Sequence, residues 1–136
     1  MADRWLLKTE PGTYSWADLA RDGRTVWDGV KNPLALKHLG AMAKGDEALL
    51  YHSGSERAAV GIARVVRAPY PDPKKKDPRL VVVDLESVRE LAKPVRLADM
   101  RANPKLAGFD LLRLPRLSVM PVPAAVWAEI LRMAAA

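Results

Sequence analysis

The chain has 136 residues, of which 49% are hydrophobic, and it carries a formal net charge of +6. This composition excludes a disordered chain and suits one domain with a single core, which we expect to span residues 1–136. The absence of cysteine excludes disulfides, thiol nucleophiles and thiolate metal sites, and the positive charge permits nucleic acid as a partner without requiring it.

The sequence gives no sign of a membrane partner. The first residues lack the pattern of a signal peptide, and no apolar run is long enough for a transmembrane helix. A chain without cysteine also fits a reducing compartment. We therefore expect a cytoplasmic location.

The chain begins with a short strand and a short helix. The apolar run at residues 4–8 predicts a buried strand. Ser15 and Asp18 have the spacing of a capping box, so a helix should follow and end at Gly23. Residues 24–27 form a brief extended piece that leads into the most informative stretch of the sequence.

That stretch runs from Trp27 to Pro33. Asn32 is a favoured N-cap and Pro33 is tolerated at the first helical position, so a helix is predicted over residues 33–42. A ring for stacking, the Asp28 carboxylate and the backbone donors of a helix start together suit a nucleobase. The same pattern also fits a buried Trp beside a turn and a capped helix.

The second half of the chain is richer in strands. Apolar patterns predict strands over residues 47–52, 58–67, 80–91, where Pro94 would end the strand, and 117–122. Prolines between residues 69 and 73 should break the structure before the Lys74–Lys76 loop. Helical turns are predicted over residues 97–101, 104–107 and 109–114, and a C-terminal helix from Pro123.

These elements show no βαβ rhythm. They indicate an α+β domain whose mixed sheet curls into a small barrel with short peripheral helices. Trp5 and Trp127 have apolar neighbours and are expected in the core.

Signs of catalysis are weak. His52 and Ser53 are neighbours in a strand and should point to opposite faces, and neither His38 nor His52 has a carboxylate at metal-ligand spacing. No glycine-rich phosphate loop is present. We therefore expect a binding protein with no metal or cofactor rather than an enzyme. Tyr51 fits either a half-buried core ring or a second wall opposite Trp27.

Six motifs resemble, in the same order, those of the EVE domain family. They are Trp5-Leu-Leu-Lys-Thr-Glu-Pro11, Trp27-Asp-Gly-Val-Lys-Asn32, Tyr51-His-Ser53, Gly61-Ile-Ala63, Ala68-Pro-Tyr-Pro-Asp72 and Arg116-Leu-Ser-Val119. The resemblance covers residues 4–130, nearly the whole chain. It implies a PUA-like fold and recognition of modified bases, especially 5-methylcytosine and its oxidised forms in DNA.

The resemblance also implies site residues. At or near a nucleobase pocket it places Lys8, Thr9, Trp27, Asp28, Val30, Asn32, Tyr51, His52, Ser53 and Leu117. Within that pocket we expect the ring of Trp27 to be partly exposed. For contact with phosphate, the candidates are Lys31, Lys74, Lys75 and Lys76. Lys31 stands where relatives commonly have Arg, which weakens any bidentate phosphate clamp there.

Four functions remain open at this point. The first is a non-catalytic reader that holds one modified DNA base between aromatic walls. The alternatives are a module that binds modified or structured RNA, an enzyme acting on a nucleoside or base, and an interaction module with a vestigial pocket. The sequence does not indicate an oligomeric state.

Overall fold

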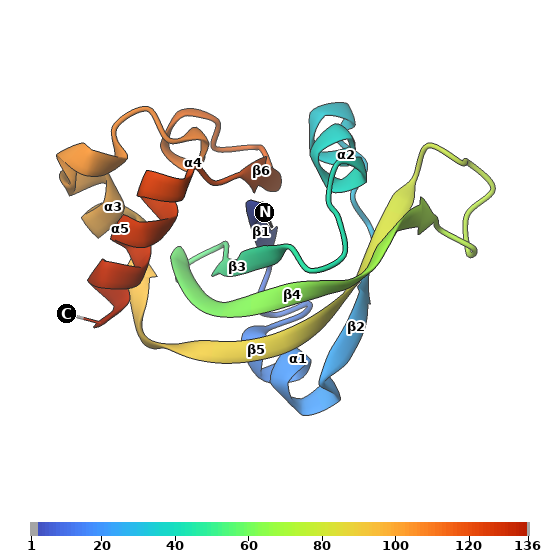
Figure 1. Cartoon of the computed structure of the whole chain (residues 1–136), viewed down its shortest axis with the longest axis horizontal. Helices are drawn as coiled ribbons and strands as arrows, with labels where there is room; N and C mark the ends of the chain where they lie inside the picture. Colours follow the sequence, from blue (N-terminus) through green and yellow to red (C-terminus); the bar gives the residue numbers. More distant parts are fainter. Residues whose placement is uncertain (1–2, 136) are drawn as a thin grey trace.

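A computed structural model describes residues 3–135 as one mixed sheet with short helices on both sides (Figure 1). The strands are β1 (Arg4–Thr9), β2 (Arg24–Trp27), β3 (Glu47–His52), β4 (Ala58–Pro71), β5 (Val81–Arg96) and β6 (Val119–Pro121). Their order across the sheet is β2-β5-β4-β3-β1-β6. β1 and β3 are parallel and the other neighbours are antiparallel.

The predicted α+β fold with a curled mixed sheet is confirmed, but the sheet does not close into a barrel. Within the described residues, β2 and β6 remain at the two edges of the sheet. The curl comes mainly from β4 and β5, the two long strands that bend across Figure 1. The sheet is therefore open at the end where β1 and β2 finish and the loops after them begin.

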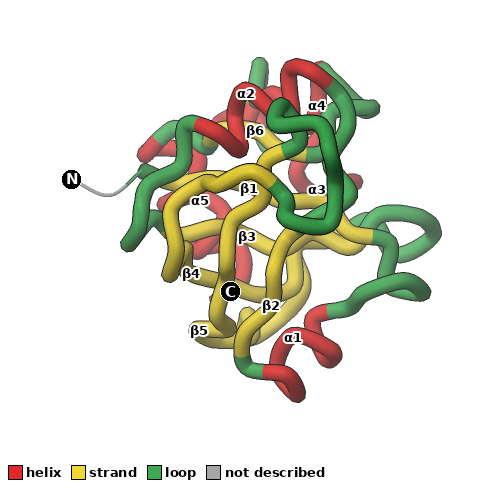
Figure 2. The backbone as a smooth tube through the Cα atoms, turned by 90° about the vertical axis from the view of Figure 1, so that its right-hand side faces the viewer, coloured by secondary structure: helices red, strands yellow, loops and turns green. Residues whose placement is uncertain are grey.

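Helices lie on both sides of this sheet. They are α1 (Trp16–Asp22), α2 (Pro33–Gly40), α3 (Leu97–Ala102), the 3-10 turn η1 (Pro104–Leu106), α4 (Asp110–Arg113) and α5 (Ala124–Ala135). Figures 1 and 2 both show α1 alone below the sheet, with α2 and α4 above it. In the described part of the chain, no helix is both long and apolar enough to cross a membrane.

Two predicted helix starts are confirmed. The Ser15 hydroxyl accepts a hydrogen bond from the Asp18 N–H, and the Asp18 carboxylate accepts one from the Ser15 N–H, which completes the capping box. At α2 the Asn32 side chain accepts from the Ala35 N–H over 3.0 Å. α2 ends at Gly40, two residues before the predicted end.

The predicted strand ends near prolines are wrong. β4 continues through Pro71, and β5 passes Pro94 to reach Arg96. The pairing of β4 with β5 jumps from Gly61↔Glu90 to Ala59↔Val95, so residues 91–94 bulge out of the ladder. A bulge tolerates proline, because its missing N–H is not needed for pairing there.

The core contains the tryptophans expected there. Trp5 and Trp127 are 5% and 8% exposed, which confirms both as core residues. The Trp5 indole N–H donates to the buried carboxylate of Asp46 over 2.9 Å. Asp46 also accepts from the backbone N–H of Asp3 and of Ala43, so this buried charge is fully engaged.

Trp16 of α1 packs directly against the sheet. Gly61 in β4 has no side chain to separate them, and a Cβ placed on Gly61 would lie 2.4 Å from Trp16 Cε3. This close approach fixes the position of α1 beneath β4, and with it the loop that joins β1 to α1.

Candidate functional site

A cavity of about 510 Å³ opens where β1 and β2 end. Four segments of the chain contribute to its lining: the end of β1 with the following loop, β2, the loop before α2, and the residue before β6. The lining residues are Lys8, Thr9, Glu10, Thr13, Tyr14, Thr25, Val26, Trp27, Asp28, Gly29, Val30, Lys31 and Ser118.

Trp27 lies at one wall of this cavity but is more buried than expected. Its side chain is 8% exposed, so the predicted partial exposure is wrong. Two neighbours explain the burial: β5 pairs with β2 at Val83, and the Tyr14 ring meets the Trp27 ring edge-on. The indole still borders the cavity, and Gly29, two residues later, has a φ of 79°, a conformation that favours glycine.

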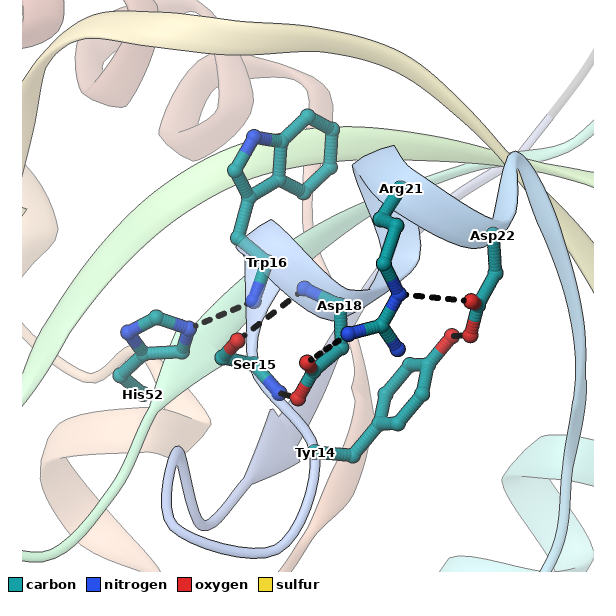
Figure 3. Close-up of polar contacts among 7 residues, drawn as sticks. All are labelled: Tyr14, Ser15, Trp16, Asp18, Arg21, Asp22 and His52. Carbon is teal, nitrogen blue, oxygen red and sulfur yellow. Dashed lines mark hydrogen bonds and ion pairs between the residues drawn. The ribbon is translucent and has the colours of Figure 1, made fainter.

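The loop between β1 and α1 forms the adjoining side of the cavity and is held by several hydrogen bonds. The Thr9 hydroxyl donates to the Tyr14 carbonyl over 2.6 Å. The Tyr14 hydroxyl donates to Asp22 over 2.9 Å, as Figure 3 shows. Burial, together with the Asp22 charge, raises the pKa of Tyr14, so its hydroxyl stays protonated at neutral pH.

His52, the last residue of β3, anchors the end of the same loop. Its Nε2 accepts a hydrogen bond from the backbone N–H of Trp16 over 2.9 Å (Figure 3). Its Nδ1 lies 2.8 Å from Glu56 Oε1. A neutral ring that accepts at Nε2 and donates at Nδ1 satisfies both contacts. The structure therefore places His52 at the start of α1, outside the lining of the first cavity.

Lys8 lies between the first cavity and a smaller cavity next to it. Its ammonium donates to the Pro115 carbonyl over 2.8 Å and lies 5.8 Å from the centre of the Tyr51 ring. Partial burial lowers the pKa of Lys8. Lys8 lines both the first cavity and a second one of about 230 Å³.

The structure brings some of the predicted site residues together and separates others. The first cavity is lined by Lys8, Thr9, Trp27, Asp28 and Val30, and also by Lys31. Tyr51 and Ser53 line the second cavity and so do not face Trp27.

The remaining predicted site residues lie elsewhere. Asn32 caps α2 and Leu117 is buried with 5% exposure, and neither lines either cavity. The three lysines at positions 74–76 are exposed on the loop after β4 and line neither cavity.

Several lining residues were missed from the sequence. Thr13, Tyr14 and Thr25 reach the cavity from segments that showed no motif. Ser118 was within a recognised motif, but its neighbour Leu117 was chosen instead. The Leu117 side chain is buried, whereas Ser118 lines the cavity, so an error of one position exchanged a site residue for a core residue.

The lining offers binding groups of several kinds: an indole ring, hydroxyls, two lysines and two carboxylates. Such a set can hold a flat polar ring by stacking and hydrogen bonds. Across residues 3–135, no group of three or more His, Asp or Glu side chains is placed to hold a metal ion.

Comparison with known proteins places the whole chain, rather than its cavity, beside a family. The EVE domain family model matches residues 3–133. Thymocyte nuclear protein 1 from Homo sapiens is 28% identical over 156 residues, which covers 90% of this chain and 69% of that protein. The Mus musculus protein of the same name is 30% identical with the same coverage.

Solved structures agree closely with the fold. Rpa0253 from Rhodopseudomonas palustris superposes with a TM-score of 0.94 at 39% identity, covering 98% of this chain and 94% of that one. Human THYN1 in complex with 5-methylcytosine-containing DNA gives a TM-score of 0.89 at 28% identity, covering 98% of both chains. The ASCH protein from Zymomonas mobilis shares the fold alone, with a TM-score of 0.64 at 8% identity over 96% of this chain and 95% of that one.

Proposed function

The chain belongs to the EVE domain family, and we propose that it is a non-catalytic reader of 5-methylcytosine or an oxidised form of it in DNA. The observation that carries the proposal is the position of Trp27 beside polar groups in one cavity at the open end of the sheet. The crystal structure of human THYN1 with 5-methylcytosine-containing DNA supports the choice of ligand.

The dimensions and chemistry of the cavity suit a single base. About 510 Å³ lies within the range of roughly 300–1,000 Å³ that is usual for small-ligand sites. In this arrangement the Trp27 ring stacks on the base, and the Asp28 carboxylate accepts from the exocyclic amine of cytosine. Val30 offers an apolar contact for a methyl group.

Binding of this kind needs the base to leave its stack. Unstacking and unpairing cost a few kcal/mol, and stacking on one aromatic side chain returns roughly 1–3 kcal/mol. Hydrogen bonds donated by the Lys8 ammonium and the Ser118 hydroxyl, and one accepted by the Thr9 hydroxyl oxygen, would have to supply the remainder. The cost of extracting the base and the gain from binding it are therefore nearly equal. A contact with one methyl group can then determine whether the modified or the plain base binds.

The test is a binding series with matched oligonucleotides. Fluorescence anisotropy should show tighter binding to DNA with one 5-methylcytosine, or an oxidised form, than to the same DNA with plain cytosine. Equal affinities would contradict the proposal, and tighter binding to RNA of the same sequence would favour the RNA-binding alternative. Turnover of a nucleoside, followed by chromatography, would contradict a non-catalytic role.

A variant sharpens this test at the proposed methyl contact. Val30→Thr keeps the volume of the side chain but replaces a methyl group with a hydroxyl. We expect the ratio of affinities for methylated and plain DNA to fall, while binding to plain DNA changes little. A ratio equal to that of the parent would exclude Val30 as the methyl contact.

A further inference from the structure

We propose that the second cavity is a phosphate site that holds the backbone phosphate next to the base bound beside Trp27. The ligand is a phosphodiester, and the proposal rests on the function proposed above. The cavity measures about 230 Å³ and includes Lys8, Tyr51, Ser53, Arg57 and Arg101 in its lining. No carboxylate is among its lining residues.

The three cations of this cavity lack acidic partners. Within the described residues, none of them forms an ion pair with a carboxylate: Lys8 donates to the Pro115 carbonyl, and Arg57 Nε donates to the Gly54 carbonyl over 3.2 Å. The exposed side chain of Arg101 has no hydrogen bond or ion pair in that same part of the chain.

Seven of the eleven arginines elsewhere in the chain are neutralised by acids, whereas Arg67, Arg89, Arg96 and Arg116 form no ion pair within the described residues. Ion pairs to aspartate or glutamate are formed by Arg4, Arg21, Arg24, Arg64, Arg79, Arg113 and Arg132. The second cavity differs in that three cations without an acidic partner line it together, and three positive charges around one cavity repel one another and favour an anion between them.

Tyr51 adds a neutral donor to this site. Its side chain is 3% exposed, and its hydroxyl has no hydrogen-bond partner among residues 3–135. Burial raises the pKa of Tyr51, although the charges of Arg57 and Arg101, which line the same cavity, act to lower it. A protonated hydroxyl in a cavity that two arginines also line can donate to a phosphate oxygen.

The backbone at Arg57 is unusual as well. Its φ is 50°, and it is the sole non-glycine residue with a positive φ in the described chain. The Leu97 N–H donates to the Arg57 carbonyl over 2.8 Å and holds this conformation. Conformations of this kind cost free energy and are found preferentially at ligand-binding positions.

Lys8 connects the two cavities, because its side chain borders both. In a nucleotide, one sugar joins the base to its phosphate, so adjoining sites for a ring and an anion match adjoining parts of one strand. A contact to phosphate contributes affinity but no sequence information.

The test uses the double variant Arg57→Gln/Arg101→Gln and the matched control Arg89→Gln/Lys44→Gln. The control removes the same charge at exposed positions outside both cavities. We expect the first variant to bind methylated and plain DNA roughly tenfold more weakly, with the ratio of the two unchanged. Its plot of log affinity against log salt should be shallower by about 0.7 for one phosphate of a single strand.

The outcomes separate this proposal from the base-reading one. If the parent shows no preference for a modified base, the salt plots on plain DNA still decide whether the phosphate site exists. Equal affinity and slope for the first variant and its control would overturn the site. If inorganic phosphate shifted the NMR signals of the Arg57 and Arg101 side chains but the variants bound DNA as the parent does, the phosphodiester assignment would be wrong.

Discussion

The Tyr14 ring meets the Trp27 ring edge-on, with centroids 6.3 Å apart and planes inclined at 79°. Tyr14 is tied to Asp22 through its hydroxyl, so the pair forms a fixed corner of the first cavity. A base entering this corner finds the indole already oriented and does not have to order it, which lowers the entropic cost of binding.

The first prediction compares two tryptophans of equal burial. Trp27 and Trp127 are both 8% exposed, so replacing either with Phe removes a similar amount of buried ring. Trp27→Phe should weaken binding of modified DNA by on the order of 1 kcal/mol, because the stacking surface shrinks. Trp127→Phe should lower the melting temperature without changing affinity. Calorimetry measures the melting temperatures and fluorescence anisotropy the affinities. If both variants lost the same affinity for modified DNA, Trp27 would not belong to the site.

The second prediction concerns His52, which anchors the loop between β1 and α1. His52→Ala leaves the Trp16 N–H without its acceptor, which should cost about 1–3 kcal/mol of folding free energy. The amide of Trp16 should then exchange with solvent faster in hydrogen-exchange NMR. Glu56→Gln is the control, because it alters the exposed partner of His52 and leaves the bond to Trp16 intact. An unchanged exchange rate in His52→Ala would show that the loop keeps its conformation without the hydrogen bond to His52.

The third prediction concerns the Lys74–Lys76 loop. These side chains are exposed and lie outside both cavities. Replacing all three with Ala should reduce the salt dependence of DNA binding, because fewer counterions are released. The preference between modified and plain DNA should not change. A change in that preference, measured on matched oligonucleotides, would show that the loop contacts the nucleobase.

The fourth prediction is a pH dependence of stability at α5. Glu129 lies 2.6 Å from both Arg132 and Asn103, and these contacts, Arg132 first, lower its pKa from 4.5 to about 2. The pKa is depressed in the folded state, so the stabilisation is complete above pH 4.5 and is lost as the pH falls through about 2.

Glu129→Gln should therefore melt at a lower temperature than the parent at pH 7, and the gap should narrow as the pH falls towards 2. Thermal unfolding followed by circular dichroism at a series of pH values measures it. A gap that stays constant across this range would mean that the charge of Glu129 does not contribute.

Local signals in the sequence predicted local structure well. The starts of α1 and α2 were found because Ser15 and Asn32 satisfy free N–H groups with their own side chains, which needs no tertiary contact. The path of β5 through Pro94 was missed, because a bulge is a property of two paired strands and not of either one alone.

The site was only partly predictable for the same reason. Trp27, Asp28, Val30 and Lys31 follow one another in the chain, so one motif located them together. Tyr14 and Ser118 reach the cavity only after the sheet has formed. Tyr51 lines the second cavity, and Lys8 separates it from the cavity beside Trp27. The spacing of residues along the chain does not predict this arrangement.

The close packing of Trp16 on Gly61 has a consequence for the history of the chain. Any side chain at position 61 collides with the indole, and any smaller residue at position 16 leaves a void over the bare backbone. Neither position can therefore change alone without penalty. Across homologous sequences the two should vary as a pair, with glycine at one wherever a large ring occupies the other.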